Sequence, residues 1–112
     1  MRRLQHFIII QWLFIRFTVA PSITVRPTNQ TVEEGGLVTF NCSAIGNPIP
    51  NITWINNGKT VTQGNTLSID ANRNHSGRYW CLADNGLNPT VNASANLDVQ
   101  CKFVIDIGLM EQ

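Results

Sequence analysis

One stretch decides the fold of this chain: Arg73-Asn74-His75-Ser76-Gly77-Arg78-Tyr79-Trp80-Cys81. The alternation at its end continues beyond it, because Tyr79, Cys81 and Ala83 occupy one phase while Trp80 and Leu82 occupy the other. A period of two residues is typical of a β-strand that buries one face. The stretch therefore predicts a strand with an inward cysteine and an outward tryptophan, entered from a turn that contains glycine.

The same alternation recurs along the chain from Ser22 onward, and no segment there has the apolar spacing of a helix over three turns. Alternating runs occur at residues 38–42, 52–54, 67–69 and 91–99. The turn-forming residues between the runs are Glu34-Gly35-Gly36, Gly46-Asn47-Pro48, Asn56-Asn57-Gly58 and Asn85-Gly86. The chain of 112 residues is too short for a second core, so we expect one all-β domain.

The composition argues against several classes of function. Lys and Arg number 8 against 7 Asp and Glu, which leaves no basic stripe to bind a nucleic acid. Only two histidines occur, and the sequence has no catalytic motif, phosphate-binding glycine loop or Cys-x-x-Cys pair. His75 is interpreted as a solvated turn residue. We therefore expect no enzyme, no metal site and no cofactor.

The cysteines carry the most specific signal. Cys42 and Cys81 share the inward phase of their strands, so a disulfide between them would cross the core and join two sheets. Trp54 lies twelve residues after Cys42, and Tyr79 lies two residues before Cys81. From about Ser22 to Gln100 the sequence resembles the immunoglobulin superfamily, which has this cysteine, tryptophan and tyrosine arrangement.

The resemblance implies an immunoglobulin-like sandwich of two antiparallel sheets with one inter-sheet disulfide, and a core signature of Trp54, Tyr79 and Gly77. The twelve residues between Trp54 and Leu67 leave room for one short strand near residues 60–62, which implies an intermediate-set or constant-2-like domain. The sequence departs from the family at His75, where an Asp is usual. The missing carboxylate puts the usual bracing of the tyrosine corner in question, although not the fold.

Residues 1–20 have the layout of a secretory signal peptide. Arg2 and Arg3 precede an apolar run at residues 7–15, and the small residues of 18–20 suit a cleavage site. The run is too short to cross a bilayer. We expect a domain at residues 21–100 and a tail at residues 101–112; a leader foreign to the working protein is the alternative.

Further features suit an extracellular glycoprotein. Five asparagines head a glycosylation triplet: Asn29, Asn41, Asn51, Asn74 and Asn92. Cys101 is the odd cysteine, and its thiol would either form an intermolecular disulfide, and so a dimer, or have lost its partner with the rest of a longer protein.

The outward phase predicts a binding face. Ile55, Trp80 and Leu82 would lie on neighbouring strands and face solvent, and clustered apolar residues of this kind often mark an interface. The alternative is that a neighbouring domain, or an aliphatic stem such as that of Lys59, shields them.

The leading hypothesis is an extracellular module, secreted or at the cell surface, that mediates protein–protein recognition in cell adhesion or in receptor–ligand contact. Its partner would be a cell-surface or matrix protein, or a second copy of the chain. The alternatives are a structural spacer domain and a fragment of a larger multi-domain receptor or matrix protein.

Overall fold

The computed structural model describes residues 17–101. Residues 1–16 of the expected leader and residues 102–112 of the expected tail lie outside this range. Within it the elements are β1 (Val19–Val25), β2 (Gln30–Glu33), β3 (Leu37–Asn41), β4 (Ser43–Asn47), β5 (Asn51–Asn56), β6 (Lys59–Gln63), β7 (Thr66–Asp70), the 3-10 helix η1 (Arg73–His75), β8 (Gly77–Asp84) and β9 (Val91–Gln100).

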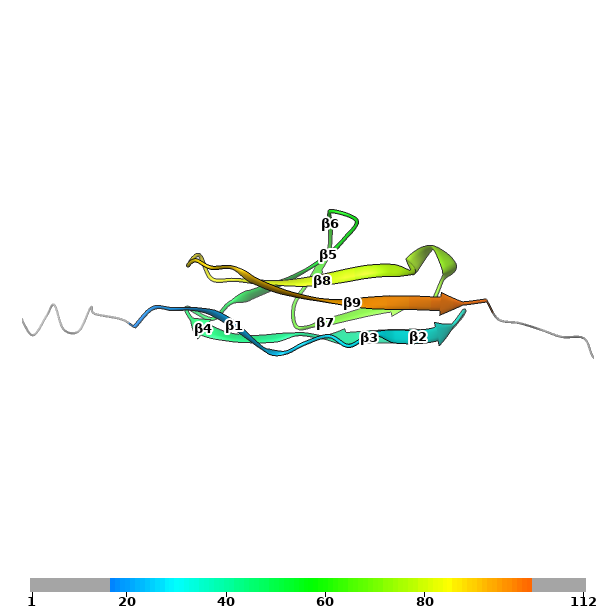
Figure 1. The fold of residues 1–112 in the computed structure, drawn as a ribbon, viewed down its shortest axis with the longest axis horizontal. Helices are drawn as coiled ribbons and strands as arrows, with labels where there is room; N and C mark the ends of the chain where they lie inside the picture. Colours follow the sequence, from blue (N-terminus) through cyan, green and yellow to red (C-terminus); the bar gives the residue numbers. More distant parts are fainter. Residues whose placement is uncertain (1–16, 102–112) are drawn as a thin grey trace, which may run out of the picture.

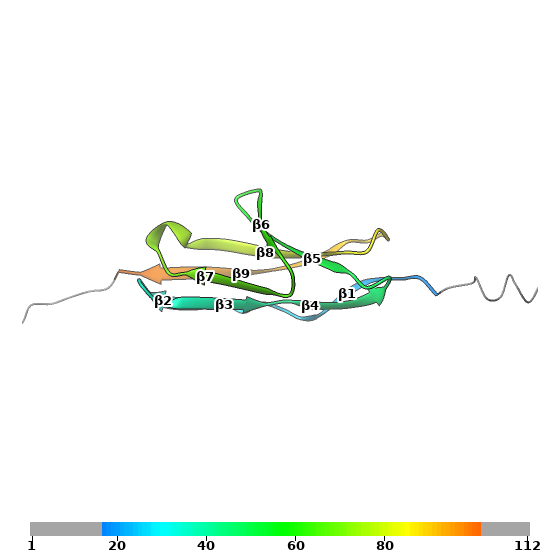
Figure 2. The same cartoon turned by 180° about the vertical axis from the view of Figure 1, so that it is seen from behind.

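The strands form two layers, which lie one above the other in Figures 1 and 2. One layer is a five-stranded sheet in the order β2-β9-β8-β5-β6. The other consists of two pairs, β1 with β4 and β3 with β7, and β3 and β4 follow one another across Cys42. The expected all-β sandwich is confirmed. The only strand between β5 and β7 in residues 17–101 is β6, as the short spacing after Trp54 predicts.

One pairing departs from the expected antiparallel arrangement. β2 runs parallel to β9, from Gln30 opposite Leu97 to Glu33 opposite Gln100. After β1 the chain leaves the β4 layer through the buried Pro27 and joins the other sheet as β2, so it continues in the same direction beside β9. The sandwich is therefore mixed at this edge.

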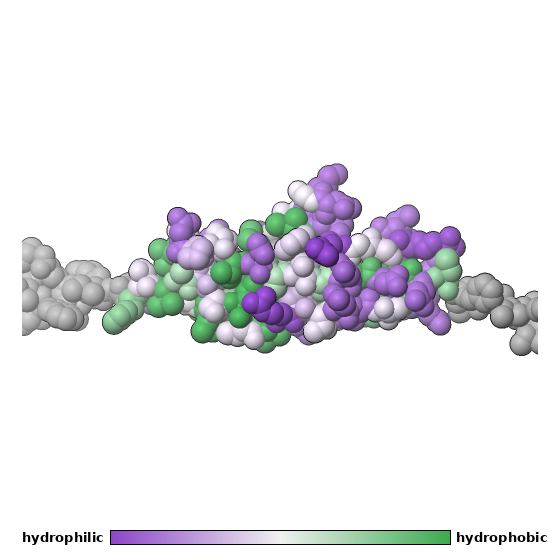
Figure 3. Space-filling view, viewed as in Figure 1, coloured by the Kyte–Doolittle hydropathy of each residue, from purple (hydrophilic) through white to green (hydrophobic). Residues whose placement is uncertain are grey.

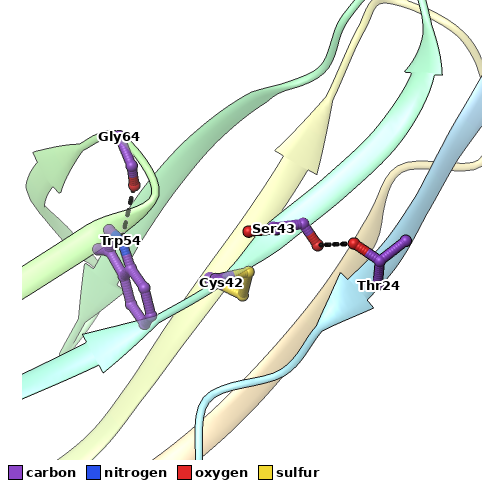
Figure 4. The surroundings of a disulfide bond; sticks show 6 residues. Thr24, Cys42, Ser43, Trp54 and Gly64 are labelled. Atoms are coloured by element: carbon purple, nitrogen blue, oxygen red, sulfur yellow. Dashed lines mark hydrogen bonds between the residues drawn. A yellow bond between two sulfur atoms is a disulfide. The ribbon is translucent and has the colours of Figure 1, made fainter.

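The core is built from the inward residues of both layers. Cys42 and Cys81 form the expected disulfide, and both are fully buried. Trp54 lies beside this bond in Figure 4, and its Nε1 donates a hydrogen bond of 2.9 Å to the Gly64 carbonyl. This bond satisfies the indole N–H of a side chain that is otherwise completely enclosed by apolar groups.

The two Asn-Gly sequences, at residues 57–58 and 85–86, lie in different kinds of connection between strands. Asn57 and Gly58 have φ angles of 53° and 74°, and Asn56 pairs with Lys59, so β5 and β6 are joined by a two-residue turn of the primed type. The tight turn expected at Asn85-Gly86 is not formed, because residues 85–90 make a longer loop. The Asn85 amide is used elsewhere: its Nδ2 donates to the carbonyls of Val19 and Pro48, at 2.8 and 2.9 Å.

The first strand begins before the expected domain boundary. The boundary between Ala20 and Pro21 falls inside β1, because Val19 already pairs with Asn47 in β4. The Asn85 amide also holds the Val19 carbonyl. Residues 19 and 20 are therefore part of the folded sandwich in this structure.

Candidate recognition face

The tyrosine corner sets the position of β8. The Tyr79 hydroxyl donates a hydrogen bond of 2.7 Å to the His75 carbonyl, which fixes η1 against the start of the strand. Burial of the phenol raises the pKa of Tyr79. His75, in place of the usual Asp, brings its Nδ1 to 2.6 Å from the Asp70 carbonyl oxygen. The corner therefore forms without the carboxylate, because the Tyr79 hydroxyl bonds to the backbone carbonyl of residue 75 and not to its side chain.

Gly77 provides the bend that leads from this corner into β8. Its φ angle is 145°, a conformation that L-residues with a side chain rarely adopt. The strand that follows places Tyr79 and Cys81 in the core and turns Trp80 and Leu82 to the opposite side. Gly77 and Tyr79, both named from the sequence, therefore determine together which side chains of β8 face the core.

The outward residues of β5, β8 and β9 form one surface with rows of cross-strand neighbours, which we call the β5–β8–β9 face. In one row Ile55, Trp80 and Ser94 stand side by side. In the next row Thr53, Leu82 and Asn92 do so, and beyond it Asn51 stands opposite Asp84. The three apolar residues named from the sequence therefore lie together on neighbouring strands.

Exposure within this face is uneven. Trp80 is 37% exposed, whereas Ile55 and Leu82 are partly buried. The hydroxyl residues Thr53 and Ser94 flank the apolar group, and the charged side chains of β8 stand at its two ends, as Arg78 and Asp84. The middle of the face is thus uncharged and partly apolar.

Arg78 is a member of this face that sequence reasoning missed. Its guanidinium carbon lies 5.8 Å from the centroid of the Trp80 ring, within the range of a cation–π interaction. Its Nε also donates to Asn96 Oδ1 at 3.2 Å, which ties it to β9. The group that covers part of Trp80 is therefore Arg78, where the sequence suggested Lys59. The spacing of two residues along β8 was the signal that could have identified it.

The glycosylation triplets are spread over the molecule, and all five acceptor asparagines are exposed. Asn51 and Asn92 lie on the β5–β8–β9 face, where Ala83 pairs with Val91 and Asn92 stands opposite Leu82. The other three lie elsewhere: Asn29 in the loop before β2, Asn41 on β3 and Asn74 in η1.

Apolar side chains are also exposed away from this face. Leu37 and Ile45, on β3 and β4 of the other layer, are 68% and 61% exposed. Figure 3 shows hydrophobic residues concentrated over the half of the molecule that carries β1 and β4, and strongly hydrophilic ones over the end with η1. Leu37 stands opposite Asp70 and is separated from Trp80 by the thickness of the sandwich, which makes it a useful reference position.

The described part of the chain shows few groups suited to other chemistry. Cys101, just after β9, is exposed and unpaired among residues 17–101. Within the same residues no three His, Cys, Asp or Glu side chains are grouped so that they could hold a metal ion. None of the helices described is long and apolar enough to cross a membrane.

A disulfide-bridged sandwich with a buried tryptophan and a tyrosine corner defines an immunoglobulin-like domain. A family profile described as an immunoglobulin domain matches residues 20–85, and the chain belongs to this family. Among curated proteins, the chain is 36% identical over 93 residues to the tyrosine-protein phosphatase Lar of Drosophila melanogaster, covering 75% of this chain and 5% of that protein. It is 34% identical over 110 residues to the neural cell adhesion molecule L1 of Mus musculus, covering 88% of this chain and 9% of that protein.

Solved structures give the same picture. Immunoglobulin domains 1–5 of Sidekick-1 superpose with a TM-score of 0.71 at 30% identity, over 77% of this chain and 21% of that one. A chain in the complex of Dpr2 Ig1-Ig2 with DIP-Theta Ig1-Ig3 gives a TM-score of 0.65 at 35% identity, over 73% of this chain and 32% of that one. The chain spans less than a tenth of the length of the two curated relatives.

Proposed function

We propose that this chain is an extracellular recognition module that binds another immunoglobulin domain through its β5–β8–β9 face, in cell adhesion or receptor contact. The observation that carries the proposal is Trp80, a large aromatic side chain that stays 37% exposed although the Arg78 guanidinium lies against its ring. Tryptophan and arginine are both enriched in interface hot spots, and here they lie in contact. The relatives support the same reading, since they include an adhesion molecule and a receptor-type phosphatase.

The nature of the partner is inferred from the solved neighbours. Two of them are complexes in which immunoglobulin domains of Dpr proteins meet those of DIP proteins. A second copy of this chain and a different immunoglobulin domain are both partners of this chemistry. In this reading the module has no catalytic role of its own, and it acts by contact alone.

The test compares two variants that each lose one exposed apolar side chain, on opposite layers of the sandwich. Trp80→Thr removes the exposed tryptophan of the β5–β8–β9 face, and Leu37→Thr removes an exposed leucine from β3. Association is measured by sedimentation of the chain alone and by binding to a panel of immunoglobulin ectodomains. Loss of a hot spot weakens binding by at least 2 kcal/mol, or roughly thirtyfold.

We expect that large loss for Trp80→Thr and an affinity near that of the unmodified chain for Leu37→Thr. Circular dichroism and thermal unfolding confirm that each variant is folded. Equal affinity in all three proteins, or no association of the unmodified chain with itself or with any panel member, would contradict the proposal. A spacer domain is the second candidate function, and it predicts that the unmodified chain associates neither with itself nor with any panel member.

A further inference from the structure

Two of the five glycosylation triplets each lie within a single strand of the five-stranded sheet, β5 or β9. In Asn51-Ile52-Thr53 the middle residue is buried, and so is the middle residue of Asn92-Ala93-Ser94. Because side chains alternate along a strand, the asparagine and the hydroxyl residue of each triplet share the outward side of the five-stranded sheet. Both acceptor amides are exposed, on strands whose orientation the core fixes.

These two asparagines lie on either side of the same part of the face. Asn92, on β9, stands directly opposite Leu82, on β8, and the Cβ atoms of such a cross-strand pair are about 5 Å apart. Asn51 stands opposite Asp84, which is the next outward residue after Leu82 along β8. Trp80 has Ser94 and Ile55 as its direct neighbours and no acceptor opposite it. A hydrophilic group on each asparagine would therefore reach Leu82 from two sides.

The remaining acceptors lie away from Leu82. Asn41 lies on β3 in the other layer, with its Oδ1 accepting a hydrogen bond from Thr66. Asn29, in the loop before β2, accepts a hydrogen bond through its Oδ1 from the backbone N–H of Asn96, which stands opposite Arg78. Asn74 lies in η1, at the end of β8 opposite to the β8–β9 loop. Asn74 is therefore a control acceptor on the same molecule.

We propose that Asn51 and Asn92 carry N-linked oligosaccharides that cover the Leu82 end of the β5–β8–β9 face and leave its Trp80 end open to a partner. The inference rests on the proposed function, because the sugars are added in the secretory pathway and the open end is the recognition surface.

Each amide nitrogen attacks C1 of an oligosaccharide carried on a polyprenyl diphosphate. The C1–O bond breaks, a C1–N bond forms, and the amide proton and the polyprenyl diphosphate leave.

The experiment needs no partner. The full chain is produced in a eukaryotic secretory host, and occupancy is read by peptide mass after enzymatic release of the sugars in heavy-oxygen water, which marks each former glycan site. Hydroxyl-radical footprinting of the folded protein then measures oxidation of Leu82 and Trp80. It is repeated on Asn51→Gln with Asn92→Gln, on Asn74→Gln, and on folded unmodified chain stripped of its sugars.

We expect sugar at Asn51 and Asn92, and a severalfold rise in Leu82 oxidation in the double variant and in the stripped protein. Trp80 oxidation should change much less, and Asn74→Gln should leave Leu82 as it is in the unmodified chain. The stripped protein gives the same reading if the double variant does not fold. A chain with no sugar at either residue, or Leu82 oxidation unaffected by sugar removal, overturns the inference.

The outcome is separable from that of the proposed function. Leu82 protected by sugar, in a chain whose association ignores Trp80→Thr, keeps the glycan inference and removes the recognition role. If association depends on Trp80 while Leu82 is equally oxidised with and without sugar, the recognition role is kept and the glycan inference is removed.

Discussion

At the scale of single residues, the tyrosine corner shows how one departure from a family pattern is absorbed. The position usually held by Asp carries His75, and the corner still closes because its hydrogen bond from Tyr79 ends on the backbone carbonyl and not on the side chain. The imidazole meets the Asp70 carbonyl instead. The residue that varies is thus the one whose side chain the corner uses least.

Tyr79 is the single tyrosine of the chain, so its titration can be followed alone. Burial raises its pKa above the ordinary value of about 10, and folding therefore favours the neutral phenol. The stability that this provides is complete below pH ~10 and is lost as the pH rises from there through the raised pKa. We expect tyrosinate absorbance to appear only above the ordinary pKa in folded protein, together with falling resistance to denaturant.

Tyr79→Phe is the control for this alkaline effect. It removes the titrating group and a hydrogen bond worth about 1 kcal/mol, so the variant should be less stable at neutral pH and should lose less stability at alkaline pH. An unmodified chain whose tyrosine ionises at the ordinary pKa, or a variant with the same alkaline loss, would contradict the expectation.

At the scale of elements, β1 is tied down by its neighbours more than by its own sequence. The Asn85 amide bridges the Val19 carbonyl and the Pro48 carbonyl, so the loop after β8 holds both the start of β1 and the turn after β4. Gly46 is close to the same amide: a Cβ there would lie 3.0 Å from Asn85 Nδ2. The beginning of the folded sandwich thus depends on a residue far along the chain.

A chain that begins at Pro21 should be less stable than one that begins at Phe17. It lacks the pairing of Val19 with Asn47 and the hydrogen bond from Asn85, and one such bond contributes about 1 kcal/mol. Urea unfolding of the two chains measures the difference. Asn85→Ala should then cost more in the longer chain than in the shorter one, and an equal cost would show that Val19 is not coupled to Asn85.

Sequence reasoning recovered the strands whose two faces differ. Alternation placed Cys42, Trp54 and Cys81 in the core, and it placed Trp80 and Leu82 outside. It did not find β1's start, the parallel edge at β2 or the long loop after β8, since each depends on hydrogen bonds between distant segments. The contact of Arg78 with Trp80 was predictable only in part. The spacing of two residues along β8 places both side chains on one side of the sheet, but the sequence does not show that the guanidinium lies over the ring.

At the scale of the whole molecule, one covalent bond links the two layers. Cys42 and Cys81 are separated by 39 positions, and closing a loop of this length stabilises a domain by roughly 4 kcal/mol in the chain-entropy description. That is a large part of the 5–15 kcal/mol typical of a folded domain. The disulfide therefore matters to the entire sandwich and not only to the strands that carry it.

Replacing Cys42 and Cys81 together by Ala should lower the free energy of unfolding by about 4 kcal/mol, as measured by urea denaturation. Cys101→Ser is the matched control, because this thiol is exposed and lies beyond β9. We expect its unfolding midpoint to equal that of the unmodified chain. A similar loss in both variants would show that the lost stability does not come from the disulfide.

The parallel edge has a mechanical consequence. β1 begins at one end of the long axis and β9 finishes at the other (Figure 1). A tensile load applied at Val19 and Gln100 would reach β2 from its Gln30 side and β9 from its Gln100 side, pulling two parallel strands in opposite directions. The pairs from Gln30–Leu97 to Glu33–Gln100 would bear that shear simultaneously instead of opening one after another. The same edge that breaks the antiparallel pattern thus makes the domain suited to holding tension between two anchored points.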